Sequence, residues 1–436
     1  MKDIYSKYCG CGYRVTTDSR AIKGGEMFFA LRGENFDGND YAMKALDSGA
    51  AWAVVNSDAA LPDDPRLVRV GDPLVTLREL AVHHRNNVGG GRRLPVIGLT
   101  GTNGKTTTKE LVKAALSAKY NVTATEGNLN NDIGVPLSLL RITPDTDIAV
   151  IEMGANHPDD IAKLVKVSQP DYGLITNVGM AHLLGFGSLE GVMAAKGELY
   201  RYLSSREGSV VFINNDDERL LDMASRMVTS HIWSYGLRYQ GAEILETTPD
   251  NPYLGIRLSD GTVVRTALVG SYNAANVLAA LAVAEYFGVD RAAAVAAIGA
   301  YVPKNNRSQM LKTAHNTVIV DAYNANPSSM KAAIENFSAM KAGSRLALLG
   351  DMRELGDDSV KEHCRILRLL EAEHIDAALV GDEFGKALKE TGFKAVAWFP
   401  DSASLKLWLE SNPVEDRVIL VKGSRGIMME KVLESI

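Results

Sequence analysis

A glycine-rich stretch near residue 100 constrains the fold of this chain more than any other part of the sequence. An apolar run at 96–99 is followed by Gly101 and Gly104, and Lys105-Thr106 then opens a segment whose apolar residues recur at helical spacing. Glycines let a loop turn tightly with its N–H groups facing inward, and the start of a helix adds the positive end of its dipole. This order of strand, glycine loop and helix predicts a site for the phosphates of a nucleotide triphosphate.

The loop departs from the general phosphate-binding pattern at one position. The pattern G-x-x-x-x-G-K-[ST] requires glycine at position 99, where this chain has Leu99, so the prediction rests on the shorter form that ends in Lys105-Thr106. An ordinary glycine-rich turn between a strand and a helix is the alternative. We expect the loop to bind ATP through Gly101, Thr102, Asn103, Gly104, Lys105, Thr106 and Thr107.

Composition narrows the class of protein. With 436 residues the chain is long enough for two to three domains. Its 47 Lys and Arg against 53 Asp and Glu give a net charge of −6, which argues against a general nucleic-acid binder. Three cysteines are too few for a disulfide framework, and no apolar run reaches the ~18 residues of a membrane span. We therefore expect a cytoplasmic protein that is not inserted in a membrane.

The pattern of apolar runs divides the chain into three α/β units. Residues 1–90 predict a small N-terminal α/β domain, with a glycine-rich linker at 86–93. Residues 91–306 predict a central ATPase-like domain with a mostly parallel sheet, because strand-like runs alternate with helix-length segments. Residues 307–436 repeat that alternation and predict a Rossmann-like C-terminal domain. Within the central unit, alternating residues around Asp260-Gly261 predict a β-hairpin.

Polar residues follow the predicted strands of the central unit, where ligands bind in parallel sheets. Glu152 follows one apolar run, and we expect it to help bind Mg²⁺ beside Thr106, with a structural carboxylate as the alternative. His182 follows the next run. Asn273 and Asn276 lie one turn apart at the start of a predicted helix that ends before Gly288, where they could cap the helix or contact a ligand.

Several motifs, in this order along nearly the whole chain, resemble those of the Mur ligase family of peptidoglycan synthesis. They are Gly101-Thr-Asn-Gly-Lys-Thr-Thr107, Glu152-Met-Gly-Ala-Asn-His157, Thr176-Asn-Val-Gly-Met-Ala-His182, Lys196-Gly-Glu198 and Asn214-Asn-Asp-Asp217. Asp321-Ala-Tyr-Asn-Ala-Asn-Pro327 and Leu349-Gly-Asp-Met-Arg-Glu-Leu-Gly356 are similar to the members that add D-alanyl-D-alanine to a UDP-N-acetylmuramoyl-tripeptide. Asp18-Ser-Arg20 and Gly33-Glu-Asn-Phe-Asp37-Gly38 look like the family's domain for the uridine nucleotide.

The resemblance implies an ADP-forming acid–D-amino-acid ligase that works through an acyl phosphate. It implies two Mg²⁺ ions bound near Thr106, Glu152, His182 and Lys196, with Lys105, Glu152, His182 and Lys196 as the catalytic residues. The family's matching lysine is carbamylated, so Lys196 is expected to carry a carbamate. Burial that lowers a lysine pKa favours this reaction, because CO₂ adds only to the neutral amine.

The resemblance also assigns the remaining contacts. Near the nucleotide it implies Asn273, Asn276, Arg307 and Asp321. On the UDP-linked substrate it implies Ser19, Arg20 and Asp37, and on the dipeptide side Asn324, Asn326, Ser424 and Arg425. We expect a monomer whose active site forms only when the three domains close on one another, so the protein without ligands would be open.

The sequence differs from the family pattern at three positions, and two other functions are alternatives to the ligase prediction. Tyr272, Asn306 and Asn39 stand where the family usually has His, Gly and His. The rivals are another amide ligase of the same architecture, such as a folylpolyglutamate synthase, and an ATP-binding switch that forms no bond. The sequence leaves open whether the tripeptide ends in diaminopimelate or lysine.

Overall fold

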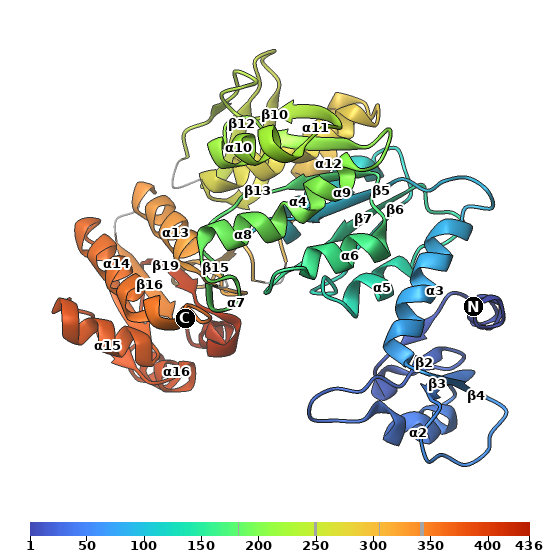
Figure 1. Cartoon of the computed structure of the whole chain (residues 1–436). Coiled ribbons are helices and arrows are strands. Elements are labelled where there is room, and N and C mark those ends of the chain that lie inside the picture. Colours follow the sequence, from blue (N-terminus) through green and yellow to red (C-terminus); the bar gives the residue numbers. More distant parts are fainter. Residues whose placement is uncertain (182, 248–250, 305, 341–343) are drawn as a thin grey trace.

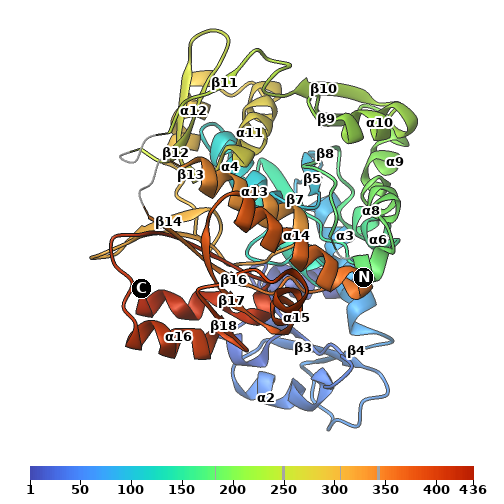
Figure 2. The ribbon, with the colours of Figure 1, turned by 90° about the vertical axis from the view of Figure 1, so that its left-hand side faces the viewer.

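The structure, a computed structural model, describes residues 1–181, 183–247, 251–304, 306–340 and 344–436. Three α/β domains follow one another along the chain, each built around its own sheet (Figure 1). This confirms the predicted fold class. The N-terminal and C-terminal domains are attached to the central domain at separate places, as the two views together show (Figures 1 and 2).

The N-terminal domain contains a four-stranded parallel sheet in the order β1-β2-β3-β4. Its elements are α1 (Lys2–Gly10), β1 (Val15–Thr16), β2 (Met27–Phe29), α2 (Ala42–Asp47), β3 (Trp52–Asn56), β4 (Leu67–Val70) and α3 (Pro73–Asn87). The predicted strands at 27–31 and 51–55 correspond to β2 and β3. Helix α3 starts sharply because the Asp72 carboxylate accepts the N–H groups of Leu74 and Val75, and Pro73 needs no partner for its nitrogen.

The central domain has a six-stranded parallel sheet in the order β10-β9-β8-β5-β7-β6. Its strands are β5 (Val96–Thr100), β6 (Val122–Ala124), β7 (Ile148–Glu152), β8 (Tyr172–Ile175), β9 (Val210–Asn214) and β10 (His231–Tyr235). Its helices are α4 (Lys105–Ser117), α5 (Gly134–Leu139), α6 (Asp160–Ser168), α7 (Leu183–Phe186), α8 (Leu189–Lys196), α9 (Glu198–Ser204) and α10 (Glu218–Met227). Because β5 lies between β7 and β8, residues that follow these three strands meet at one edge of the sheet.

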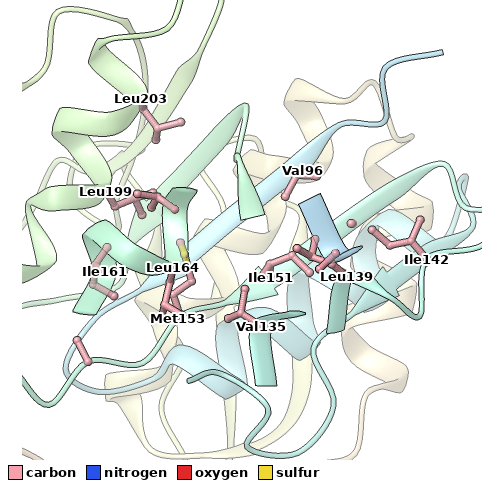
Figure 3. Packing of buried hydrophobic residues seen from close by; sticks show 14 of the residues in the cluster. Val96, Val135, Leu139, Ile142, Ile151, Met153, Ile161, Leu164, Leu199 and Leu203 are labelled. Carbon is pink, nitrogen blue, oxygen red and sulfur yellow. The ribbon is translucent and has the colours of Figure 1, made fainter. Parts of the chain in front are cut away.

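Both faces of the central sheet are buried, which explains why its strands read as continuous apolar runs. Ile97 and Leu99 of β5 pack on the face covered by α4 and α11, while Val96 packs on the face covered by α5, α6 and α9. Figure 3 shows this second face, where Val135 and Leu139 of α5 lie near Ile151 of β7.

A small antiparallel sheet and two further helices complete the central domain. They are β11 (Glu243–Ile244), β12 (Tyr253–Arg257), β13 (Val263–Val269), α11 (Ala274–Tyr286) and α12 (Arg291–Ala300). The predicted hairpin is confirmed, since β12 and β13 pair antiparallel across the turn that contains Gly261. The predicted helix is confirmed too, and Gly288 follows it in the left-handed conformation expected of a helix stop.

The C-terminal domain has a six-stranded sheet in the order β14-β15-β19-β16-β17-β18. Its strands are β14 (Gln309–Lys312), β15 (Thr317–Asp321), β16 (Arg345–Gly350), β17 (Asp376–Val380), β18 (Ala397–Phe399) and β19 (Val418–Lys422), and only β14 pairs antiparallel. Helices α13 (Pro327–Ala339), α14 (Ser359–Ala372) and α15 (Asp382–Thr391) cover one face, and α16 (Ser402–Ser411) covers the other. The edge strands β14 and β18 were not predicted from the sequence.

The N-terminal and central domains share one hydrophobic core, so the predicted linker is not a free tether. Leu77 and Leu80 of α3 belong to the same buried cluster as Val135 of α5 and Val96 of β5. Helix α3 extends through Asn87, inside the predicted linker, and its buried Arg85 forms an ion pair of 2.7 Å with Asp171 at the start of β8. The linker prediction was wrong at its N-terminal end because tertiary packing extends the helix. In the described part of the chain no helix is long and apolar enough to cross a membrane.

His84 makes the contact between these two domains sensitive to pH. Its Nε2 donates to the carbonyl of Ile142 at 2.8 Å, its Nδ1 lies 3.3 Å from the Tyr5 hydroxyl, and the ring is fully buried. Burial lowers the pKa of His84 from 6.5 to about 4. The unfolded chain therefore takes up a proton at His84 at a higher pH than the folded chain does.

We predict that protonation of His84 lowers the free energy of unfolding by about 2 kcal/mol between pH 7.5 and pH 5.0. This stabilisation is fully present above the unfolded pKa and is lost as the pH falls toward the folded pKa. Urea unfolding of the wild type and of His84→Gln should show a stability difference that shrinks by this amount at pH 5.0. The control is His231→Gln, because His231 is exposed. If the stability difference between wild type and His84→Gln were the same at pH 7.5 and pH 5.0, His84 would not be the source of the pH dependence.

Candidate functional site

The predicted phosphate loop connects β5 to α4, and two of its residues must be glycines. Gly101 and Gly104 have positive φ angles of 148° and 77°. A Cβ atom on Gly101 would lie 1.9 Å from the Thr176 hydroxyl, and one on Gly104 would lie 2.7 Å from the Asn276 side-chain oxygen. The loop is therefore fixed by close packing as well as by its turn.

Lys105 begins α4 and is folded back over the loop. Its Nζ donates to the carbonyls of Gly101 at 2.8 Å and Thr102 at 3.0 Å. Burial lowers the pKa of Lys105 from 10.5 to about 8; nearby Glu152 opposes this shift and Arg307 adds to it. The oxygens of a bound phosphate group would replace these two carbonyls as hydrogen-bond acceptors for Lys105, and because they are charged they would form stronger hydrogen bonds.

Thr106 and Glu152 form a buried pair at the ends of α4 and β7. The Thr106 hydroxyl lies 2.9 Å from the Glu152 carboxylate, and the side-chain nitrogen of Asn130 donates to that carboxylate at 2.8 Å. Glu152 is 1% exposed, and among the described residues no cationic side chain lies within ion-pair distance of it. A hydroxyl, a carboxylate and an amide make an oxygen-rich set that fits Mg²⁺.

Asn273 and Asn276 join the loop helix to the small antiparallel sheet. Thr108 of α4 donates to the side chain of Asn276 at 3.0 Å, which in turn donates to Asn273 at 2.9 Å. Asn273 donates to the Val269 carbonyl at the end of β13. Both asparagines are buried and line the cleft described below, and neither side chain caps α11, so of the two roles weighed from the sequence the capping role is wrong and the ligand role stays a prediction.

A cleft of about 650 Å³ separates the phosphate loop from the C-terminal domain. On its far wall the Arg307 guanidinium lies 3.6 Å from the ring centroid of Tyr323, and the Arg425 guanidinium lies 5.6 Å from the same centroid. Asp321 also lines this wall, where its carboxylate accepts from Lys422 at 2.6 Å. Cationic groups thus face the phosphate loop across the cleft.

The cleft brings together most of the residues predicted from the sequence. Those that line it are Thr102, Asn103, Gly104, Lys105, Thr106, Thr107, Glu152, Asn273, Asn276, Arg307, Asp321, Asn324, Asn326, Ser424 and Arg425. Gly101 lies directly before them in the loop. The predicted His182 is outside the described residues.

Lys196 lies at the end of α8 and is not among the residues that line the cleft. It is 1% exposed, its Nζ is 5.8 Å from the ring centroid of Phe186, and no carboxylate in the described part of the chain is within ion-pair distance. Burial, with a contribution from the charge of Lys105, lowers the pKa of Lys196 from 10.5 to about 7. Its motif neighbour Glu198 has a structural role, since it accepts the N–H groups of Asp159 and Ala162 at the start of α6.

The residues predicted for the UDP-linked substrate lie on the N-terminal domain and do not line this cleft. Ser19 begins a short 3₁₀ turn whose Arg20 is exposed and pairs with Asp18. Asp37 pairs with Arg32 and accepts from Asn39, which is buried and also donates to Asn56. The departure at Asn39 is therefore explained by a satisfied internal hydrogen-bond network.

Of the other two departures, Tyr272 lines the cleft and Asn306 directly precedes Arg307 of its lining. The Tyr272 hydroxyl is 3.1 Å from the Ser308 hydroxyl, and its ring fills the space beside Gly270. Burial raises the pKa of Tyr272. Asn306 has a left-handed backbone with φ of 57°, a conformation that asparagine tolerates better than most residues, and its carbonyl accepts from the Tyr323 amide.

Several cleft residues were not predicted. Asn130 is brought to Glu152 by a loop between β6 and α5 that carries no recognisable motif. Asn177 stands in the motif at 176–182 without a predicted role, and its side chain donates to the carbonyl of Asn103 and accepts from the Asn103 amide. Lys422 is the last residue of β19. Its position after an apolar run was the only feature of the sequence that could have indicated a role in the cleft. Arg353 also lines the cleft.

Comparison with known families and proteins agrees with this geometry. Profiles of three Mur ligase regions match in succession, namely the "Mur ligase family, catalytic domain" at 13–84, the "Mur ligase middle domain" at 99–284 and the "Mur ligase, glutamate ligase domain" at 306–425. The chain is 36% identical over 430 residues to the UDP-N-acetylmuramoyl-tripeptide–D-alanyl-D-alanine ligase of Escherichia coli (strain K12). That alignment covers 97% of this chain and 93% of the relative.

Solved structures are similar over almost the whole chain. A crystal structure of MurF from Acinetobacter baumannii matches with a TM-score of 0.84 and 31% identity, covering 97% of this chain and 92% of that one. The structure of MurF ligase from Thermotoga maritima in complex with ADP matches with a TM-score of 0.82 and 27% identity, covering 100% and 98%.

Proposed function

The chain belongs to the Mur ligase family, and we propose that it joins D-alanyl-D-alanine to UDP-N-acetylmuramoyl-tripeptide with conversion of ATP to ADP and phosphate. The observation that carries this proposal is the cleft in which the phosphate loop and the buried Glu152 face the Tyr323 and Arg425 motifs of the C-terminal domain. The product is a peptidoglycan precursor. Because ATP and a UDP-linked precursor are its substrates, we place the reaction in the cytoplasm. We also expect the protein to be a monomer.

We assign one substrate to each domain. Residues 1–90 bind the UDP-linked substrate, with Ser19, Arg20 and Asp37 as the proposed contacts. Residues 91–306 bind ATP, and residues 307–436 bind the incoming dipeptide. The N-terminal and C-terminal domains lie at separate places on the central domain, which supports this division (Figure 1).

The first chemical step is phosphoryl transfer. The terminal carboxylate of the tripeptide attacks the γ-phosphorus of ATP, ADP leaves, and an acyl phosphate forms. Lys105 and the N–H groups of the loop hold the phosphates, and Arg307 with the Asp321–Lys422 pair lies across the cleft on the nucleotide side. Alignment and neutralisation of charge account for most of the catalysis in reactions of this class.

The charge of Glu152 supports a magnesium site beside the loop. When Mg²⁺ is bound, it neutralises phosphate charge and polarises the phosphorus toward attack. Thr106 and Glu152 would hold it, and Asn130 orients the Glu152 carboxylate through its hydrogen bond. We propose a second ion near Lys196 and His182, as the family resemblance implies.

Lys196 is proposed to carry a carbamate, which turns an amine into an anion. Its nearly complete burial and its pKa of about 7 support this, because a large fraction of the amine is neutral at cellular pH and can add CO₂. An anion at this position would also remove the repulsion between Lys196 and Lys105.

The second chemical step forms the amide bond. The amine of D-alanyl-D-alanine attacks the acyl carbon, phosphate leaves, and the amine loses a proton. Asn324, Ser424 and Arg425 are proposed to orient the dipeptide, and the positive charge of Arg425 suits its free carboxylate.

The function is tested by phosphate release from Mg-ATP with each substrate added or withheld. We expect release to require both UDP-N-acetylmuramoyl-tripeptide and D-alanyl-D-alanine, and mass spectrometry to detect the tripeptide extended by one dipeptide less water. Phosphate release at the same rate with and without the dipeptide would instead favour an ATP-binding switch. Turnover with a different amine in an acceptor screen would favour another amide ligase.

Carbamylation is tested by ¹³C NMR of protein equilibrated with ¹³C-bicarbonate. We expect a carbamate resonance that grows between pH 6 and pH 8, because the neutral fraction of Lys196 rises through a pKa of about 7. Lys196→Met, which keeps the apolar volume, should abolish the resonance and lower turnover about 100-fold or more while ADP still binds. An equal resonance in wild type and Lys196→Met would contradict the assignment.

A further inference from the structure

One hydrogen bond joins the phosphate loop directly to the C-terminal domain. The side-chain nitrogen of Asn326 donates to the side-chain oxygen of Asn103 at 2.8 Å, although the two residues are 223 positions apart in the sequence. Asn103 lies in the middle of the phosphate loop, and Asn326 immediately precedes α13. The contact therefore spans the cleft that is proposed to hold ATP and the dipeptide.

The orientation of the Asn326 side chain is fixed by its second role. Its side-chain oxygen accepts the Ser329 N–H at 2.9 Å, and the Ser329 hydroxyl accepts the Asn326 N–H at 3.1 Å, which together form a capping box at the start of α13. Because the oxygen is used by the cap, the nitrogen must point away from the helix and toward Asn103.

The backbone of Asn103 is held by three hydrogen bonds on the other side of the contact. Its N–H donates to the side-chain oxygen of Asn177 at 2.9 Å, and the Asn177 side-chain nitrogen donates to the Asn103 carbonyl at 3.0 Å. The Thr176 hydroxyl donates to the same carbonyl at 2.6 Å. The bond from Asn326 thus connects a side chain oriented by the helix cap to a loop whose backbone is held at Asn103.

The connection continues from Asn326 to the proposed dipeptide side. The neighbouring carbonyl of Ala325 accepts from the Ser424 hydroxyl at 3.2 Å, and that hydroxyl accepts the Arg353 N–H at 2.8 Å. Ser424 is 2% exposed, so this link lies in the interior of the domain. Hydrogen bonds and the Ala325–Asn326 peptide therefore connect the phosphate loop to Ser424 and Arg353.

We propose that Asn326 is a positioning residue that sets the distance between the phosphate end of ATP and the amine held by the C-terminal domain. This inference rests on the proposed function, because it needs both reacting groups in one cleft. Both polar atoms of Asn326 are engaged by protein groups, so the inference gives it a different role from the direct dipeptide contact predicted from the sequence. Small errors in such a distance are costly, since a shift of ~1 Å can slow a reaction about 100-fold.

The test separates the interdomain bond from the helix cap. Serine caps a helix about as well as asparagine but is too short to reach Asn103, so Asn326→Ser removes only the bond. Asn326→Ala removes both the bond and the cap. Asp401 caps α16 in the same domain away from the cleft, by accepting the Ser404 N–H at 2.8 Å, and Asp401→Ala is the matched control for loss of a cap.

We expect Asn326→Ser to melt close to the wild-type temperature, to bind ADP within about twofold of wild type, and to lose kcat about tenfold or more. Asn326→Ala should lose a similar factor in kcat and also melt at a lower temperature. Asp401→Ala should melt lower with wild-type kcat. Because Asn103→Ser breaks the same bond, the double variant with Asn326→Ser should be no more than about twofold slower than the slower single variant.

Two results would overturn the positioning role. One is wild-type kcat in Asn326→Ser, and the other is a double variant whose loss is the product of the two single losses. Failure of the proposed function is seen separately, because the wild type would then release no phosphate that depends on the dipeptide. If the wild type does depend on both substrates and Asn326→Ser is unaffected, only the positioning role fails.

Discussion

The candidate site depends on a buried carboxylate that has no cationic side chain within ion-pair distance among the described residues. Glu152 at the end of β7 is held by the Thr106 hydroxyl and the Asn130 amide, 1% exposed. Burying an anion without an ion-pair partner raises the free energy of the folded protein. The site therefore favours binding of a cation from solution. The pKa of nearby Lys105 is lowered to about 8, which still leaves most of this lysine charged near neutral pH. Nucleotide and metal binding would satisfy both groups at once, which links the fold of the central sheet to its chemistry.

The phosphate loop was predictable from the sequence because its signal is local. Gly101 and Gly104 are required by backbone conformation and close packing within one turn, and Lys105 and Thr106 follow directly. Glu152 was predictable one level higher, from the rule that ligands meet the carboxyl ends of parallel strands. Asn130 and Lys422 could not be assigned, because their partners Glu152 and Asp321 are chosen by packing between distant segments. For the same reason the linker prediction missed the core that α3 shares with the central domain.

The C-terminal domain shows how one residue type can serve fold and function together. Asn326 starts α13 by capping it and also reaches the phosphate loop. Motif residues such as Asp321 and Ser424 are likewise occupied by internal partners while lining the cleft. The predicted closure of the three domains on their substrates stays a prediction. The contact between Asn103 and Asn326 shows that the central and C-terminal domains already touch at the phosphate loop in this structure.

The most direct test of this account is the Mg²⁺ dependence of ADP binding in wild type and in Glu152→Gln. Glutamine keeps the size of the side chain and its hydrogen bond to Thr106, but it removes the buried charge. The account predicts that the wild type binds ADP more tightly as Mg²⁺ is added and that Glu152→Gln needs about tenfold or more Mg²⁺ for the same effect. An unchanged Mg²⁺ dependence in a folded Glu152→Gln variant would contradict the central claim that this carboxylate binds the metal.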